Sequence, residues 1–127
     1  MPITAIVPQF LVDDLDRAVA YYRDRLGFTV DFTYDDFYAG VSRDGCTIHL
    51  KEAGKLAAER AHRKREEHLD AYIDVTGMQE LYADVQRRGA TVTRPLEERP
   101  WACLDFYIED ADGYILCFSE RLTKTKA

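Results

Sequence analysis

The sequence predicts an α+β fold of two βαβββ modules, which pair into a curved mixed sheet with a central cleft. The first observation is that the 127-residue chain repeats one order of extended and helical patterns. The second is that the two copies keep a nearly constant offset, with Leu15 and Met78 63 positions apart and Gly27 and Gly89 62 positions apart. One such module cannot bury both faces of its sheet, so we expect the two to pair with their helices outside.

The first module, residues 1–52, opens with an extended apolar run over Ile3 to Val12. Asp13 and Asp14 can cap the helix that follows. The apolar face of that helix has spacings of three and four and consists of Leu15, Ala18, Val19, Tyr22 and Leu26. Gly27 ends the helix, because glycine readily takes a left-handed conformation. The extended runs that follow are Phe28 to Tyr34, Phe37 to Arg43 and Cys46 to Glu52, with the hairpin signal Asp44-Gly45 before the last.

The second module, residues 69–121, repeats this order. Its first strand alternates, with one face apolar (Leu69, Ala71, Ile73 and Val75) and the other polar (Asp70, Tyr72 and Asp74). A helical face follows at Met78, Leu81, Tyr82 and Val85, and Gly89 ends it. The last three extended runs are Thr91 to Leu96, Cys103 to Glu109 and Tyr114 to Arg121, the last preceded by Asp112-Gly113. Residues 122–127 form a tail.

Between the modules, residues 53–68 are rich in Ala, Glu, Lys and Arg. We expect a solvated helix or a mobile linker here, with His62 and His68 in water. The basic side chains that could contact nucleic acid are Arg60, Arg63, Lys64 and Arg65. The acidic residues among them, Glu59, Glu66 and Glu67, favour a solvated face instead.

The composition, 46% hydrophobic and 31% charged, is that of a globular protein. A net charge of −6 argues against nucleic acid, and it fits either a cationic ligand or simple solubility. No apolar run is long enough to span a bilayer, and the N-terminus has no export pattern, so we expect a cytoplasmic protein without a membrane partner.

The three cysteines, Cys46, Cys103 and Cys117, form no Cys-x-x-Cys pair. A disulfide framework or a structural zinc site is therefore not indicated, and we expect each to be a small buried hydrophobic residue. The sequence also lacks a Gly-x-Ser-x-Gly motif and a glycine-rich phosphate loop, so nothing favours nucleophilic catalysis.

Four stretches carry a resemblance to a known family. They are Asp14-Leu15-Asp16-Arg17-Ala18 continuing to Tyr22-Arg23-Asp24-Arg25-Leu26-Gly27-Phe28, then Asp35-Asp36-Phe37 with Ala39-Gly40-Val41, then Pro100-Trp101, and last Asp110-Ala111-Asp112-Gly113. With the βαβββ repeat, they resemble the vicinal oxygen chelate superfamily, which includes glyoxalase I, extradiol dioxygenases and bleomycin resistance proteins. The second and third stretches are most similar to the bleomycin resistance branch.

This resemblance implies a homodimer that holds a flat, cationic glycopeptide antibiotic at the subunit interface and leaves it chemically unchanged. The implied stacking residues are Phe37 and Trp101, since aromatic faces give contact area and attract cations. A core role for Phe37 and simple packing for Trp101 are the alternatives. Ala102 replaces the glycine that follows Pro-Trp in the family, and Asp105 stands in for a glutamate.

The superfamily's enzymes hold a divalent metal on the first and last strands of each half. The repeat assigns those positions to Val7, His49, Asp70 and Cys117. Val7 cannot bind a metal, and His49 and Cys117 occupy the two positions at which such enzymes carry glutamate. Three of the four could hold zinc, but the alternation of His49 with Ile48 and Leu50 favours a histidine that hydrogen-bonds in the cleft.

The sequence thus predicts a metal-free small-molecule binding protein without a cofactor. The expected ligand-binding residues are Phe37, His49, Asp70, Tyr72, Asp74, Trp101, Asp105 and Cys117. Two alternatives stay open: an atypical metal-dependent lyase, isomerase or oxidoreductase of the glyoxalase and dioxygenase type, and a stress-related binding protein with a different ligand.

Overall fold

The computed structural model describes residues 4–53 and 69–122. The chain divides between residues 57 and 58 into two compact units, each of which is described here by itself. The predicted linker, with His62 and His68, lies outside the described residues except for Ala53. The described helices include none that is long and apolar enough to cross a membrane.

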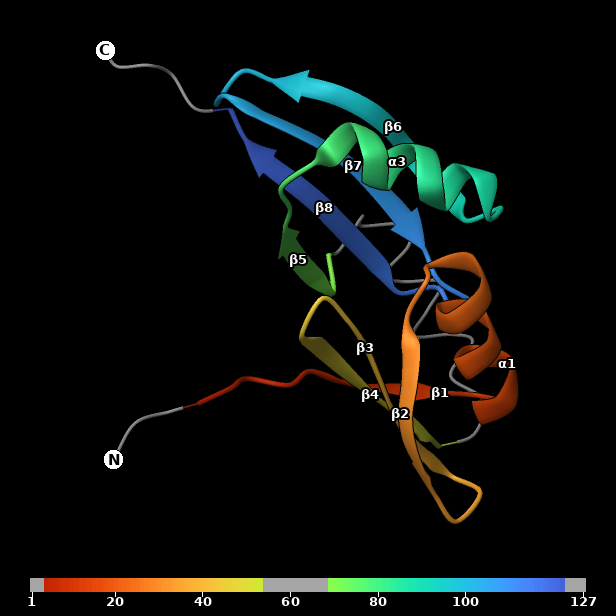
Figure 1. Cartoon of the computed structure of the whole chain (residues 1–127). Coiled ribbons are helices and arrows are strands. Elements are labelled where there is room, and N and C mark those ends of the chain that lie inside the picture. The colour runs from red at the N-terminus through yellow and green to blue at the C-terminus, as the bar shows by residue number, and fades with distance from the viewer. Residues whose placement is uncertain (1–3, 54–68, 123–127) are drawn as a thin grey trace. The chain divides into compact units, whose positions relative to one another are not determined.

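The first unit is one helix against a four-stranded sheet (Figure 1). The helix α1 spans Leu15–Ala20 and continues as a π-helical turn, η1, over Tyr21–Arg25. The strands are β1 (Gln9–Val12), β2 (Thr29–Tyr34), β3 (Tyr38–Arg43) and β4 (Cys46–Glu52). Their order in the sheet is β1-β4-β3-β2, in which β1 runs parallel to β4 and the other neighbours are antiparallel.

The helix of the first unit begins and ends where its sequence predicts. The Asp14 carboxylate caps it by accepting a 3.1 Å hydrogen bond from the backbone N–H of Arg17. At the other end, Arg43 Nη1 donates a 2.6 Å hydrogen bond to the Leu26 carbonyl. The buried residues between these ends face the apolar side of the sheet, and the core comprises Leu15, Ala18, Tyr22, Leu26, Phe10, Val12, Ala39, Val41, Ile48 and Leu50.

The first strand is shorter than predicted. The extended run was expected over Ile3 to Val12, whereas β1 begins at Gln9. Pro8 has no N–H to donate to a sheet, although its carbonyl accepts a 2.9 Å hydrogen bond from His49 N. Ladder pairing therefore starts immediately after Pro8.

The second unit repeats the architecture with β5 (Ala71–Asp74), α3 (Met78–Arg87), β6 (Thr91–Arg99), β7 (Cys103–Glu109) and β8 (Ile115–Arg121). The strand order β5-β8-β7-β6 matches that of the first unit position for position. The α+β prediction with two copies of one pattern is thus confirmed. Strand β6 runs three residues beyond the predicted Leu96, because Glu97, Glu98 and Arg99 still pair with β7.

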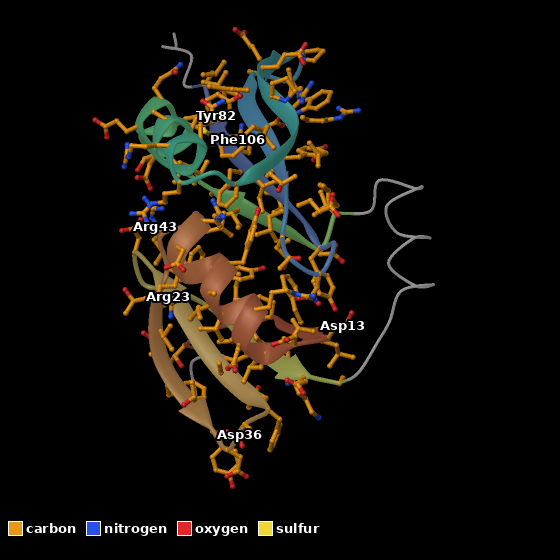
Figure 2. All side chains as sticks on the ribbon, turned by 90° about the vertical axis from the view of Figure 1, so that its right-hand side faces the viewer. Asp13, Arg23, Asp36, Arg43, Tyr82 and Phe106 are labelled. Carbon is orange, nitrogen blue, oxygen red and sulfur yellow. The ribbon has the colours of Figure 1, made fainter. Side chains whose placement is uncertain are left out.

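The core of the second unit is built around aromatic rings. Tyr82 of α3 lies beside Phe106 of β7 (Figure 2). The two rings pack edge-on at 4.8 Å between centroids, and Phe106 stacks on Phe118 at 5.1 Å. The predicted alternation in β5 is confirmed, since Tyr72 and Asp74 are exposed while their neighbours are partly covered. Leu69, which precedes the strand, is exposed rather than part of the apolar face.

Two hairpin turns require left-handed backbone. Asp44 and Gly45 join β3 to β4 with φ angles of 54° and 82°, which is the two-residue turn predicted for this pair. Between β6 and β7 the turn has three residues, closed by a 3.0 Å hydrogen bond from Ala102 N to the Arg99 carbonyl. Ala102 has φ of 65°, a conformation that glycine adopts without a steric penalty.

Replacing Ala102 by glycine should therefore stabilise the protein by about 0.5–1 kcal/mol, since relief of the left-handed strain exceeds the added entropy of the unfolded chain. Gly45→Ala is the opposite control. A Cβ at Gly45 meets nothing within 4 Å, so its cost of about 1 kcal/mol comes from the backbone alone. Chemical denaturation measures both values, and a destabilised Ala102→Gly protein would contradict the strain argument.

Candidate functional site

The sheet face of the first unit that points away from α1 carries a row of four aligned residues. Strand pairing places Gln9 beside His49, His49 beside Gly40, and Gly40 beside Phe32. Residues directly opposite one another in a sheet share a face, so this row crosses all four strands. We call it the first row.

Gly40 allows the Phe32 ring to lie across the middle of the first row. A Cβ added to Gly40 would stand only 2.3 Å from Phe32 Cε1, so the ring occupies the space where a side chain would be. From there the ring meets His49 edge-on at 5.4 Å and lies nearly parallel to Tyr38 at 6.2 Å between centroids.

Aromatic contacts continue from the first row to the β2–β3 turn. Phe37 packs edge-on against Tyr38 at 6.3 Å and against Tyr34 at 5.9 Å. Figure 2 shows Asp36, the neighbour of Phe37, at the tip of this hairpin. We define the aromatic cluster as Phe32, Tyr34, Phe37, Tyr38 and His49. Phe32, Tyr34 and Phe37 leave 38–61% of their surface exposed to water. Exposing this much aromatic surface is unfavourable for rings that could be buried.

A chain of hydrogen bonds orients the polar atoms of the cluster. Gln9 Nε2 donates to Tyr38 Oη at 3.1 Å, and Tyr38 Oη lies 2.9 Å from His49 Nδ1. The strands β1, β3 and β4 are thereby joined through side chains as well as through the backbone. His49 is thus a half-buried histidine that makes a hydrogen bond.

The equivalent row of the second unit has different chemistry. Pairing aligns Tyr72, Cys117, Tyr107 and Arg94, at the positions that Gln9, His49, Gly40 and Phe32 hold in the first unit. The guanidinium of Arg94 lies 5.3 Å from the centre of the Tyr107 ring, a cation–π contact. Tyr72 Oη donates a 2.9 Å hydrogen bond to Ser119 Oγ.

A buried ion pair lies beside this second row. Arg99 Nε donates to Asp105 at 2.7 Å and Arg99 Nη1 contacts Glu97 at 3.0 Å, with the Arg99 and Asp105 side chains only 12% and 5% exposed. The hydrogen bond that Arg99 donates to Asp105 is the main reason that the pKa of Arg99 is raised. The charge of Asp105 is therefore already balanced within the protein.

Burial also controls the protonation of the Cys117 thiol. Removal from water raises the pKa of Cys117 to about 12, and the nearby Asp105 carboxylate adds to the rise. Burial also raises the pKa of Tyr107. Cys117 is therefore a neutral thiol near pH 7 and a poor nucleophile. The prediction of small buried cysteines is confirmed for Cys103 and Cys117 and is wrong for Cys46, which is exposed at the first position of β4, beside the hairpin turn.

The structure groups the predicted ligand-binding residues by unit. Phe37 and His49 belong to the aromatic cluster. In the second unit, Tyr72, Asp74, Asp105 and Cys117 share one sheet face through their pairing. Asp70 lies before β5, where its carboxylate accepts a 2.9 Å hydrogen bond from Ile115 N at the start of β8. Trp101 lies in the β6–β7 turn with 65% of its surface exposed.

Strand pairing shows which residues lie beside His49 and Cys117. Gln9 rather than Val7 pairs with His49, and Tyr72 rather than Asp70 pairs with Cys117, two residues later in each unit. These four side chains include no carboxylate, His49 Nδ1 is engaged by Tyr38, and the Cys117 thiol is protonated near neutral pH. Within residues 4–53 and 69–122, no three histidine, cysteine or acidic side chains come together as metal ligands. The residues do not fit the metal site of the superfamily's enzymes.

Sequence reasoning missed Gln9, Phe32, Tyr38, Arg94 and Arg99. A signal for the first three existed, since a glycine inside a strand often marks a place where a neighbouring group crosses closely. The pairing of Arg99 with Asp105 had no comparable signal, because it depends on the register of β6 with β7 after a bulge.

Replacing Gly40 by alanine should expel the Phe32 ring from the first row. The overlap cannot be relieved without moving the ring, and Phe32 is exposed enough to swing into water, so we expect a loss of about 1–2 kcal/mol and an intact fold. NMR should show that nuclear Overhauser contacts between Phe32 and His49 disappear. Ser42→Ala, two residues along the same face of β3, should keep them, and their persistence in Gly40→Ala would refute this account of the cluster.

Comparison with known proteins agrees with this fold. The model of the Glyoxalase/Bleomycin resistance protein/Dioxygenase superfamily matches residues 4–118. A bleomycin resistance protein from Geobacillus stearothermophilus is 25% identical over 133 aligned residues, which cover 91% of this chain and 96% of that protein.

Two solved structures share the fold. The bleomycin-binding protein of Streptomyces verticillus, complexed with copper(II)-bleomycin, matches with a TM-score of 0.69 and 22% identity over 98% of this chain and 99% of that one. A glyoxalase-related enzyme from Clostridium phytofermentans matches with a TM-score of 0.75 and 19% identity over 96% and 98% of the two chains. The chain therefore belongs to the glyoxalase, bleomycin resistance protein and dioxygenase superfamily.

Proposed function

We propose that this protein is a metal-free binding protein that sequesters a flat, cationic small molecule in a cleft at a homodimer interface, without changing it chemically. The observation that carries the proposal is the aromatic cluster of the first unit. Three of its rings are open to solvent although they lie on a sheet whose other face is a packed core. Exposed aromatic surface of this kind is typical of a binding surface.

The cluster suits a planar ligand for physical reasons. Stacked and edge-on aromatic contacts add about 0.5–1.5 kcal/mol each beyond the burial of area. The electron-rich faces attract cations, and the exposed Asp35 and Asp36 of the β2–β3 turn add negative charge beside Phe37. The proposed cation selectivity rests on these groups of the first unit, because Arg99 already balances the charge of Asp105.

The relatives support a ligand of the bleomycin kind. The curated relative is named for bleomycin resistance, and the Streptomyces verticillus protein is described in complex with copper(II)-bleomycin. A copper-loaded ligand carries its own metal, so the protein itself needs none. Trp101 and Phe37 are the residues that we propose stack on the ligand.

A metal-dependent enzyme is the competing function, favoured by the structural similarity to a glyoxalase-related enzyme. That similarity shows the fold alone, and the donor set at the metal positions does not match. Binding without catalysis is therefore the better supported proposal.

We also propose that the protein works in the cytoplasm as a homodimer, without a nucleic-acid or membrane partner. The net charge of −6 opposes binding to nucleic acid and to anionic membranes. All three cysteines are free, which agrees with a reducing cytoplasm. A homodimer agrees with the exposed apolar side chains of Ile6 and Leu11 in the first unit.

Calorimetric titration with bleomycin and with 2,2′-bithiazole tests the ligand class. Phe37→Ala and Trp101→Ala should each weaken binding by roughly tenfold, the loss of one aromatic contact of about 1–1.5 kcal/mol. Tyr21→Ala, which removes a ring from the helix side of the first unit, should bind like the unaltered protein. Absence of binding to both compounds would refute the ligand class.

Native mass spectrometry with elemental analysis tests the assembly and the metal together. Protein purified without chelator should appear as a dimer without stoichiometric zinc, iron, manganese or nickel. A monomer at micromolar concentration would contradict the interface cleft. A full equivalent of one of these metals would favour the enzyme instead.

A further inference from the structure

We infer that His49 is a specificity-determining residue that presents its Nε2–H to the ligand, so that the ligand class is a planar heteroaromatic compound with an uncharged in-plane acceptor. This inference rests on the proposed binding function of the aromatic cluster and specifies what that surface recognises beyond aromatic shape. It assigns a recognition role to the chain of Gln9, Tyr38 and His49.

The hydrogen bonds around Tyr38 favour one tautomer of His49. Gln9 Nε2 donates to Tyr38 Oη, so the phenol oxygen is used there as an acceptor. The single phenol proton is then available for His49 Nδ1, 2.9 Å away. In a neutral imidazole one nitrogen accepts and the other carries the proton. With Nδ1 accepting, the proton is on Nε2.

The aromatic neighbours hold the imidazole in this orientation. Phe32 meets the His49 ring edge-on at 5.4 Å with an interplanar angle of 89°, and Tyr38 does so at 5.4 Å with 74°. A flip of the ring would replace Nδ1 by carbon opposite Tyr38 and lose the hydrogen bond. The donor is thus preorganised, and a ligand does not have to order it.

Nε2 has no hydrogen-bond acceptor among the residues that the structure describes, and His49 is only partly covered. The donor therefore sits in an aromatic surface whose other members offer faces rather than acceptors. A planar ligand stacked on these rings covers His49 Nε2 and must replace the water that Nε2 then loses. A ring nitrogen or a carbonyl oxygen can do so, whereas a hydrocarbon ring leaves the donor unpaired.

The tautomer can be measured without any ligand. Long-range ¹H–¹⁵N NMR spectra of the unaltered protein should show Nε2 protonated and Nδ1 bare. Tyr38→Phe, which removes the phenol proton and keeps the ring, should shift His49 toward a mixture of tautomers. A protonated Nδ1 in the unaltered protein would overturn the inference.

The recognition step is tested with a matched pair of probes, 2,2′-bithiazole and 2,2′-bithiophene, which share shape but differ in ring nitrogens. The preference for bithiazole should fall by about three- to tenfold in His49→Phe relative to the unaltered protein. Tyr21→Phe, which removes a hydroxyl from the helix side of the first unit, should leave the preference unchanged.

The outcomes separate this inference from the proposed function. If both probes bind and the preference is the same in His49→Phe, the surface binds aromatics but His49 does not select them, and the inference falls alone. If neither probe binds but bleomycin does, the inference falls alone. If bleomycin fails to bind as well, the proposed function falls and takes the inference with it.

Discussion

The missing side chain at Gly40 is the constraint on which the candidate site depends. A Cβ at this position would collide with Phe32, so the phenyl ring can lie across the central strand β3 only because residue 40 is glycine. The ring in turn holds His49 edge-on and stacks beside Tyr38. Without that space, the first row would lose the Phe32 ring at its centre, whereas the core on the other side of the sheet would keep its packing.

The two units show how one strand order carries two kinds of surface. In the first, the row reads amide, imidazole, glycine and phenyl, and it leaves rings exposed. In the second, the matching row reads phenol, thiol, phenol and guanidinium, beside the buried pair of Arg99 and Asp105. A buried ion pair contributes little net stability but is costly to break. The Arg99–Asp105 pair therefore holds this second surface in place, and its charges are already balanced.

Much of the fold could be predicted from the sequence, because periodicity and turn chemistry act locally. Asp14 caps α1, Asp44-Gly45 forms the hairpin, and the spacing of Tyr22 and Leu26 marks the buried side of the first helix. These predictions needed no knowledge of which strands become neighbours. The strand boundary at Gln9 was misjudged because apolar character continued through a proline that cannot donate to the ladder.

The site was only partly predictable, because it depends on register. Phe37 was identified by its motif and His49 by its alternation, but their link through Tyr38 follows from the pairing of β3 with β4. Repeat arithmetic grouped Val7 and Asp70 with His49 and Cys117, whereas strand pairing places Gln9 and Tyr72 beside them. Asp105 is an expected ligand-binding residue, and its pairing with Arg99 could not be predicted, because Arg99 lies on another strand beyond a bulge that no local pattern reveals.

We propose that the ligand binds on the exposed face of the first unit. Aromatic ¹³C–¹H NMR during titration with 2,2′-bithiazole reports on each ring of that face. We expect large chemical-shift changes at Phe32, Phe37, Tyr38 and His49. The core rings Tyr22 and Phe28, on the opposite side of the same sheet, should change little. Shift changes confined to residues outside the aromatic cluster would contradict it.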